Sequence, residues 1–158
     1  MHIPLDLLVT NTLELFKENL GEELLIVLDR NRADPGSVTK GSSRPDFLCW
    51  LKDVLVLIGE EKANSEDFET ALCDLDNKFN RVDPLIYGEV EFIFCYAAAG
   101  AKLRFYAIDG SKDSKNLIPL SEELDITILL DRIVAIQIVI NIARIIRTIK
   151  KTIVPLGN

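Results

Sequence analysis

The 158-residue chain has the length of one domain with a single hydrophobic core. Hydrophobic residues make up 48% of it and charged residues 27%, which is typical of a globular protein and excludes a disordered one. The 25 acidic residues outnumber the 18 basic ones, so the formal net charge is -7. This balance excludes a protein that binds polyanions through overall basic charge, and any contact with nucleic acid would require a local basic face.

The cysteines and the apolar runs exclude two further classes. Cys49, Cys73 and Cys95 are far apart, form no CxxC pair and are accompanied by His2 alone, so we expect free thiols and no zinc site. The run from Ile133 to Ala143 is well short of the ~20 apolar residues that a membrane helix needs. The first residues lack the basic segment of a signal peptide, so we expect an intracellular protein that does not enter a membrane.

The first part of the chain predicts a helix followed by an ambiguous segment. Apolar residues recur at helical spacing over residues 4–19, and Pro4 suits the first turn of a helix. The apolar run Leu24–Leu28 is compatible with either a strand or a helix. The polar stretch from Arg30 to Ser43, rich in Ser, Gly and Pro, predicts a loop.

The middle of the chain predicts a strand hairpin and a second helix. The apolar runs Phe47–Leu51 and Val54–Ile58 are separated only by Lys52-Asp53, and a two-residue polar break between such runs indicates a hairpin. A helix over roughly 65–79 should follow, capped by Asn64 or Ser65.

The remainder predicts a second hairpin and a long helix. After the break at Asp83-Pro84, the runs Val90–Ala97 and Leu103–Ile108 read as strands around a turn at residues 98–101. From about Leu124 to Ile149 a long helix carries apolar residues on most of its circumference, so it should be buried or should pair with a partner.

This order of elements predicts an α/β (α+β) fold, in which a mixed central sheet is flanked by helices and a long helix comes last. We expect residues 1–150 to form the single domain. Residues 151–158, which include Pro155 and Gly157, read as the start of a linker to a further C-terminal domain.

Two carboxylates and an amine should meet at one end of the first hairpin. Asp46 precedes the first strand of the hairpin and Glu60 follows the second, and in an antiparallel pair these two ends lie side by side. Residues two apart in a strand point to the same face, so Glu60 and Lys62 should project together while Glu61 faces away.

This combination suits metal-dependent hydrolysis of a phosphodiester. Carboxylates hold a hard cation such as Mg²⁺, with water completing its coordination. The cation polarises the phosphate and lowers the pKa of bound water, while an ammonium group stabilises the developing negative charge. The alternative is structural: Asp46 would satisfy nearby backbone N–H groups, and Glu60 and Lys62 would face solvent at a strand end.

The pattern Pro45-Asp46 followed by Glu60-x-Lys62 resembles the PD-(D/E)XK nuclease superfamily, which includes many restriction-type endonucleases. The ordered segments RPDF, GEEKA, CYAAAGAKLRFYAID and NIAR are further similar to the nuclease-like domains of crinkler-type proteins of fungi and oomycetes. This similarity covers roughly residues 40–150.

The resemblance implies a restriction-endonuclease-like fold and a DNA endonuclease activity that depends on Mg²⁺ or Mn²⁺. It implies that Asp46 and Glu60 are metal ligands and that Lys62 is the catalytic lysine. Family members often add an acid from the first helix, for which Glu14 is preferred here over Glu18. It also implies an adjoining kinase-like domain and an effector that acts in the nucleus of a host.

Two alternatives stay open at this point. The acidic total favours a nuclease-like domain that has lost activity and serves as an interaction or dimerisation domain regulating an adjoining kinase-like domain. The apolar C-terminal helix predicts a homodimer in either case. Its basic end, with Arg144, Arg147, Lys150 and Lys151, either contacts a phosphate backbone or complements the negative end of the helix dipole.

Overall fold

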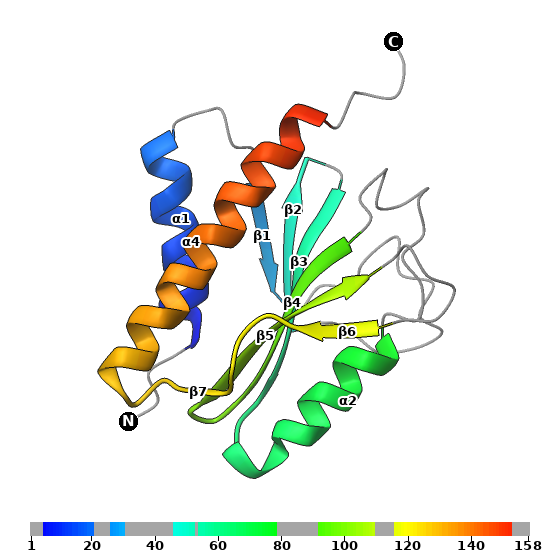
Figure 1. Ribbon diagram of the computed structural model, residues 1–158, viewed down its shortest axis with the longest axis vertical. Helices are drawn as coiled ribbons and strands as arrows, with labels where there is room; N and C mark the ends of the chain where they lie inside the picture. Colours follow the sequence, from blue (N-terminus) through cyan, green and yellow to red (C-terminus); the bar gives the residue numbers. More distant parts are fainter. Residues whose placement is uncertain are drawn as a thin grey trace.

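The computed structural model describes residues 5–20, 26–30, 46–52, 54–78, 92–109 and 116–152. These residues form a seven-stranded sheet flanked by helices (Figure 1). The helices are α1 (Leu5–Leu20), η2 (Ser65–Asp67, a 3-10 turn), α2 (Phe68–Lys78) and α4 (Leu129–Thr152). The strands are β1 (Ile26–Arg30), β2 (Phe47–Leu51), β3 (Val54–Lys62), β4 (Phe92–Ala99), β5 (Lys102–Asp109), β6 (Asn116–Pro119) and β7 (Leu124–Asp125).

The sheet is mixed, and its strands follow the order β1-β2-β3-β4-β5-β6. Strands β1, β2 and β3 form an antiparallel meander, and β4 pairs antiparallel with β5. Strand β3 is parallel to β4, which requires a crossover connection, and α2 lies within it. Both β6 and the short β7 pair antiparallel with β5. The predicted class, a mixed α/β sheet flanked by helices with a long C-terminal helix, is confirmed.

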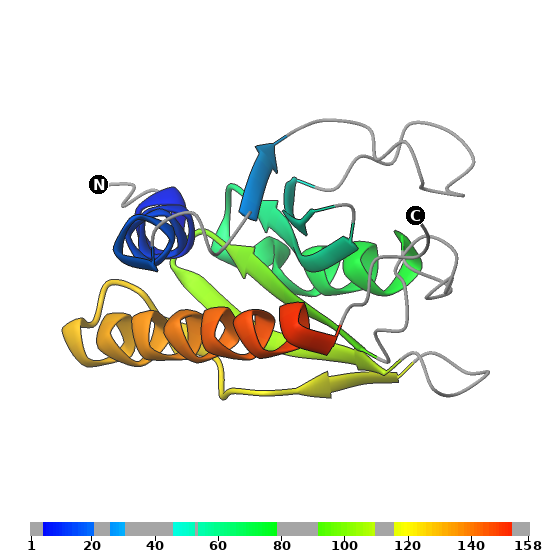
Figure 2. The same ribbon diagram turned by 90° about the horizontal axis from the view of Figure 1, so that it is seen from above.

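The helices divide between the two faces of the sheet. Helices α1 and α4 pack against each other on one face, and α2 covers the other (Figures 1 and 2). Each face has its own buried cluster. The α4-side core contains Leu13, Phe47, Leu57, Tyr96, Phe105, Val139 and Ile146 among others, and the α2-side core contains Leu48, Leu55, Ile58, Phe68, Ala71, Leu75 and Cys95 among others.

A one-residue bulge interrupts the pairing of β2 with β3. Trp50 of β2 lies opposite Leu55 of β3. The residue before it, Cys49, lies opposite Leu57, so the pairing skips Val56. Val56 is the extra residue, and it shares the α4-side core with Leu57. A bulge places two successive side chains on one face and thereby exchanges the faces of all the residues that follow.

Most of the predicted elements are present. The predicted first helix is α1, the ambiguous run at residues 24–28 contains the start of strand β1, and both hairpins are confirmed. The first hairpin forms without a glycine in its turn, because Lys52 itself takes the left-handed backbone conformation with φ 54°. Arg30, predicted to begin a loop, is the last residue of β1, and the rest of that loop and the break at Asp83-Pro84 lie outside the described residues.

The prediction was wrong about the start of the long helix, which begins at Leu129 and not at Leu124. Leu124 and Asp125 instead pair with β5 as β7, and β6 was not predicted. Asp125 then organises a turn: its Oδ1 accepts hydrogen bonds from the backbone N and the Oγ1 of Thr127, at 2.9 and 2.6 Å. These hydrogen bonds hold the pKa of Asp125 below its ordinary value. They belong to a local turn that competes with helical backbone at these residues, and α4 begins after it.

The sequence predicts buried free thiols, and this is confirmed for two of the three cysteines and wrong for Cys73. Cys49 and Cys95 are buried, Cys73 is exposed, and burial raises the pKa of the Cys49 thiol to about 12. A thiol with such a pKa is unreactive at neutral pH. Within the described residues, no helix is long and apolar enough to cross a membrane.

Candidate functional site

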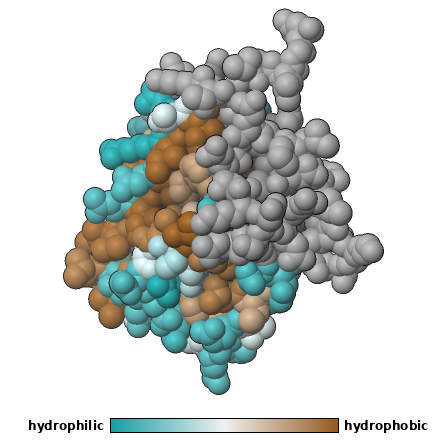
Figure 3. All heavy atoms as spheres, turned by 45° about the vertical axis from the view of Figure 1, so that its right-hand side comes forward, coloured by the Kyte–Doolittle hydropathy of each residue, from teal (hydrophilic) through white to brown (hydrophobic). Residues whose placement is uncertain are grey.

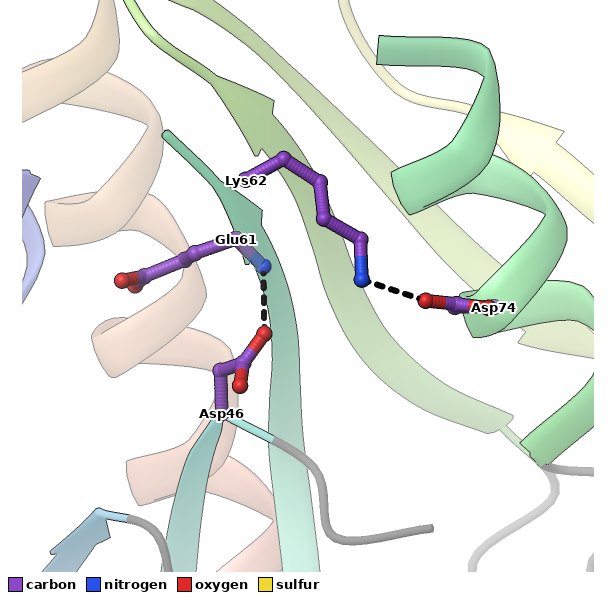
Figure 4. A network of polar contacts seen from close by, with 4 residues as sticks. All are labelled: Asp46, Glu61, Lys62 and Asp74. Atoms are coloured by element: carbon purple, nitrogen blue, oxygen red, sulfur yellow. Dashed lines mark hydrogen bonds and ion pairs between the residues drawn. The ribbon is translucent and has the colours of Figure 1, made fainter. Parts of the chain in front are cut away.

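The first hairpin brings Asp46 and Glu60 together. Phe47 lies opposite Gly59, and continuing this register by one residue places Asp46 opposite Glu60. Asp46 Oδ2 accepts a hydrogen bond of 2.8 Å from the backbone N–H of Glu61 (Figure 4), which fixes the carboxylate beside the end of β3. The approach of the two hairpin ends agrees with the expectation from the sequence. Their role as metal ligands stays a prediction.

Glu60 is a charged residue in a fully buried position. Its exposed fraction is 0%, and it is the buried charged side chain among the residues that the structure describes. Its neighbours in β4 are small, since Glu60 lies opposite Ala97 and Lys62 opposite Ala99. A buried carboxylate is stable only when cations or hydrogen-bond donors compensate for its lost hydration. The Lys62 ammonium group is one nearby positive charge, since the Glu60 carboxylate is among the charges that raise the pKa of that lysine.

Lys62 lies on the same face and reaches toward helix α2. Its Nζ donates a hydrogen bond to Asp74 Oδ2, 2.5 Å away, and the two side chains are 28% and 35% exposed (Figure 4). This hydrogen bond raises the pKa of Lys62 above its ordinary value. Partial burial opposes the rise, and the nearby carboxylates of Asp74, Glu60 and Asp46 add to it. Lys62 therefore carries its proton at neutral pH.

Asp74 was not among the residues predicted from the sequence. The helical spacing of α2 could have identified Asp74 from the sequence. Asp74 follows the buried Ala71 by three residues and directly precedes the buried Leu75. Residues three apart in a helix share a face. An acid on the helix face that packs against the sheet is a natural partner for a lysine on that sheet.

Glu61 points the other way, as strand alternation predicted. The hydroxyl of Tyr96 donates a 2.6 Å hydrogen bond to Glu61 Oε1 on the α4 side of the sheet. Tyr96 is fully buried, as expected of a core residue, and its ring lies between those of Phe47 and Phe105, with centroids 5.7 and 6.2 Å away. Gly59 makes room for it, because a Cβ there would overlap the Tyr96 ring.

The end of β3 is also fixed by the turn between β4 and β5. Gly100 adopts φ 56° in this turn, and its backbone N–H donates to the carbonyl oxygen of Lys62 at 3.0 Å. The Ser65 hydroxyl accepts a hydrogen bond from the N–H of the next turn residue, Ala101, at 3.2 Å. The strand that carries the glutamate and the lysine is thus held at both of its faces and at its end.

The structure does not bring Glu14 to this group. Glu14 is exposed on α1, which packs on the α4 side of the sheet, whereas Glu60 and Lys62 face α2. Glu18, the other acid considered on this helix, is exposed as well. Within the described ranges, no group of three or more His, Cys, Asp or Glu side chains is arranged to hold a metal ion.

The basic residues considered for phosphate contact are only partly described. Arg144 and Arg147 are exposed in the C-terminal half of α4, and both of their suggested roles stay predictions. The side chains of Lys150 and Lys151 lie outside the described part of the chain.

The fold and the site define a mixed α/β domain with two carboxylates and a lysine gathered on one face of its sheet. A comparison with known proteins finds a partial relative. The chain is 35% identical over 78 residues to Crinkler effector protein 8 of Phytophthora infestans. The matched segment is 49% of this chain and 12% of that protein, so the chain spans a small part of its relative. No family model matches the chain, and no solved structure matches it.

The contact between Gly59 and Tyr96 gives a testable prediction. Gly59→Ala should destabilise the domain by about 1–3 kcal/mol, because the added methyl group forces the buried ring out of place. The free energy of unfolding from urea denaturation measures this loss. In a chain that also carries Tyr96→Leu, the additional cost of Gly59→Ala should shrink, since the ring is gone. Equal costs in both backgrounds would contradict the proposed contact.

Proposed function

We propose that this chain is a metal-dependent nuclease domain that hydrolyses phosphodiester bonds, with DNA as its first-choice substrate. The observation that carries the proposal is the placement of Asp46 opposite Glu60 with Lys62 on the same face of the sheet. The resemblance to PD-(D/E)XK nucleases on the residues Asp46, Glu60 and Lys62 supports the same reading.

The residues present fit a hard divalent cation such as Mg²⁺ or Mn²⁺. Asp46 uses Oδ2 to accept the Glu61 N–H, which orients its carboxylate. Glu60 is buried, where a carboxylate gains most from a cation, and the small side chains of Ala97 and Ala99 line the adjacent strand. Two carboxylates with waters are an ordinary ligand set for Mg²⁺. When bound, the cation would polarise the phosphate and lower the pKa of a water molecule.

Lys62 contributes positive charge and not basicity. Its pKa is raised by the hydrogen bond to Asp74 and by the surrounding carboxylates, so it stays protonated across the neutral range. A protonated lysine cannot accept a proton from water. Its role in this proposal is to stabilise the negative charge that develops on the phosphate oxygens during hydrolysis.

The cellular role follows from the similarity to a Crinkler effector. We infer that the chain belongs to an effector that acts inside host cells, with the nucleus as the destination. Fluorescence imaging of the tagged chain in host cells measures its distribution between nucleus and cytoplasm. Exclusion of the chain from nuclei would contradict the nuclear part of the proposal.

Cleavage assays on the purified chain test the enzymatic proposal. With Mg²⁺ or Mn²⁺ it should cut single-stranded or double-stranded DNA, and a chelator should stop the reaction. Lys62→Ala and Glu60→Gln should each lower the rate by about 10²–10³-fold, the size of loss expected for a group that stabilises transition-state charge.

The matched control for this assay is Glu69→Gln, which removes one negative charge from an exposed position on α2. It should cut at the rate of the unmodified chain. Failure to cleave any DNA or RNA with either metal would contradict the proposal, and so would full activity of Lys62→Ala.

A second function is supported by a different observation. Helix α4 begins with exposed large apolar side chains, with Leu129 65%, Leu130 66% and Ile133 52% exposed. Apolar surface gathers at the lower left of Figure 3, at the height where α4 begins in Figure 1. A contiguous exposed apolar patch is typical of an interaction site. The alternative is therefore a non-catalytic domain that dimerises, or docks an adjoining kinase-like domain, through this end of α4.

Sedimentation at increasing concentration tests this second function. If α4 forms a homodimer, Leu130→Glu should shift the chain to monomer, because a charge would be buried in an apolar interface. Gln137→Glu, at an exposed polar position of the same helix, should leave the dimer intact. A chain that is monomeric at the highest concentration would overturn the homodimer.

A further inference from the structure

The ion pair between Lys62 and Asp74 indicates a further role at this site, that of Asp74. It links the end of β3 to the middle of α2, across the face that also carries Asp46 and Glu60. Figure 4 shows the lysine side chain extended from β3 toward the helix, so that its ammonium group lies on the α2 side of the site. The structure thus gives the lysine a specific orientation.

Helix α2 is a firm support for this orientation. Its face toward the sheet is buried through Phe68, Ala71 and Leu75, which are 5%, 0% and 0% exposed. Asp74 lies between two of these packed residues, so its carboxylate starts from a fixed backbone position. The lysine, by contrast, has a long side chain with several rotatable bonds, and without a partner it would sample many rotamers.

We propose that Asp74 is a positioning residue of the site, which holds the Lys62 ammonium group where it can meet a phosphate oxygen. This inference rests on the proposed nuclease function. Asp74 touches neither the substrate nor the metal in this account and acts through the lysine. An ammonium group has three donors, so two remain for phosphate oxygens after one is given to Asp74.

The contact itself adds little to the stability of the domain. Both side chains are about one third exposed, and solvent-exposed ion pairs contribute little to folding because solvent screens them. Removing Asp74 should therefore leave the fold intact. This separates a positioning role from a structural one, because only the first predicts lost activity at unchanged stability.

A double-mutant cycle in the cleavage assay tests the inference. Asp74→Asn keeps the size of the side chain and removes its charge, and it should lower kcat by at least about tenfold with KM unchanged, the effect expected from misplacing a catalytic group. In the Lys62→Ala background the same change should cause no further loss. Asp74→Glu, which keeps the charge, should retain part of the activity, and Glu69→Gln should retain all of it.

Two measurements that do not depend on cleavage complete the test. In the Asp74→Asn chain, ¹⁵N relaxation of the Lys62 ammonium group should report greater mobility than in the unmodified chain, at an unchanged thermal unfolding midpoint. The affinity for Mn²⁺ alone, from calorimetric titration, should also be unchanged. A loss of Mn²⁺ affinity would overturn the positioning role and make Asp74 a ligand.

The outcomes separate this inference from the proposed function. If the unmodified chain cleaves DNA and Asp74→Asn cleaves it with the same kcat, the positioning role is wrong and the nuclease function stands. The same holds if Asp74→Asn and Lys62→Ala lower the rate independently. If the unmodified chain cleaves no nucleic acid, both fail together.

Discussion

The bulge at Val56 is the constraint on which the rest of the site depends. The turn after β2 sets a register in which Leu51 lies opposite Val54, and without an extra residue Asp46 would lie opposite Gly59. The bulge shifts the pairing by one position, so that Asp46 meets Glu60 and the residues after the bulge exchange faces. A single unpaired residue thereby places Asp46 on the face of Glu60 and Lys62, where the unshifted register would have placed it on the face of Glu61.

Two side-chain contacts then hold the end of β3 from opposite faces. On the α4 side, Tyr96 donates to Glu61 and packs where Gly59 has no Cβ. On the α2 side, Asp74 accepts from Lys62. Glu60 lies in this stretch of β3, fully buried and opposite the small side chain of Ala97. Under the proposed function this arrangement would be preorganised, with the charged groups in place before a cation and a phosphate bind. It links the packing of the sheet to the proposed chemistry.

The sequence predicted that the two hairpin ends lie side by side because two apolar runs and a two-residue break are enough to form the hairpin. The exact pairing of Asp46 with Glu60 depends in addition on the bulge. Strand alternation was also enough to separate Glu61 from Lys62. Features that depend on tertiary packing were not predictable. The bulge cannot be recognised in the sequence, because nearly every residue of the run is apolar and no alternation is interrupted at Val56. Asp74 becomes a partner of Lys62 only once α2 packs on that face of the sheet. The start of α4 was missed because Asp125 and Thr127 form a local turn that competes with the helix.

The proposed function requires that the carboxylates of Asp46 and Glu60 together form a site for a divalent cation. A crystal of the chain soaked in Mn²⁺ and measured at a wavelength where manganese scatters anomalously tests this directly. We expect an anomalous peak within bonding distance of one oxygen of each carboxylate, about 2.0–2.6 Å for hard cations of this kind. A soaked crystal with manganese bound only elsewhere, and none between Asp46 and Glu60, would contradict it.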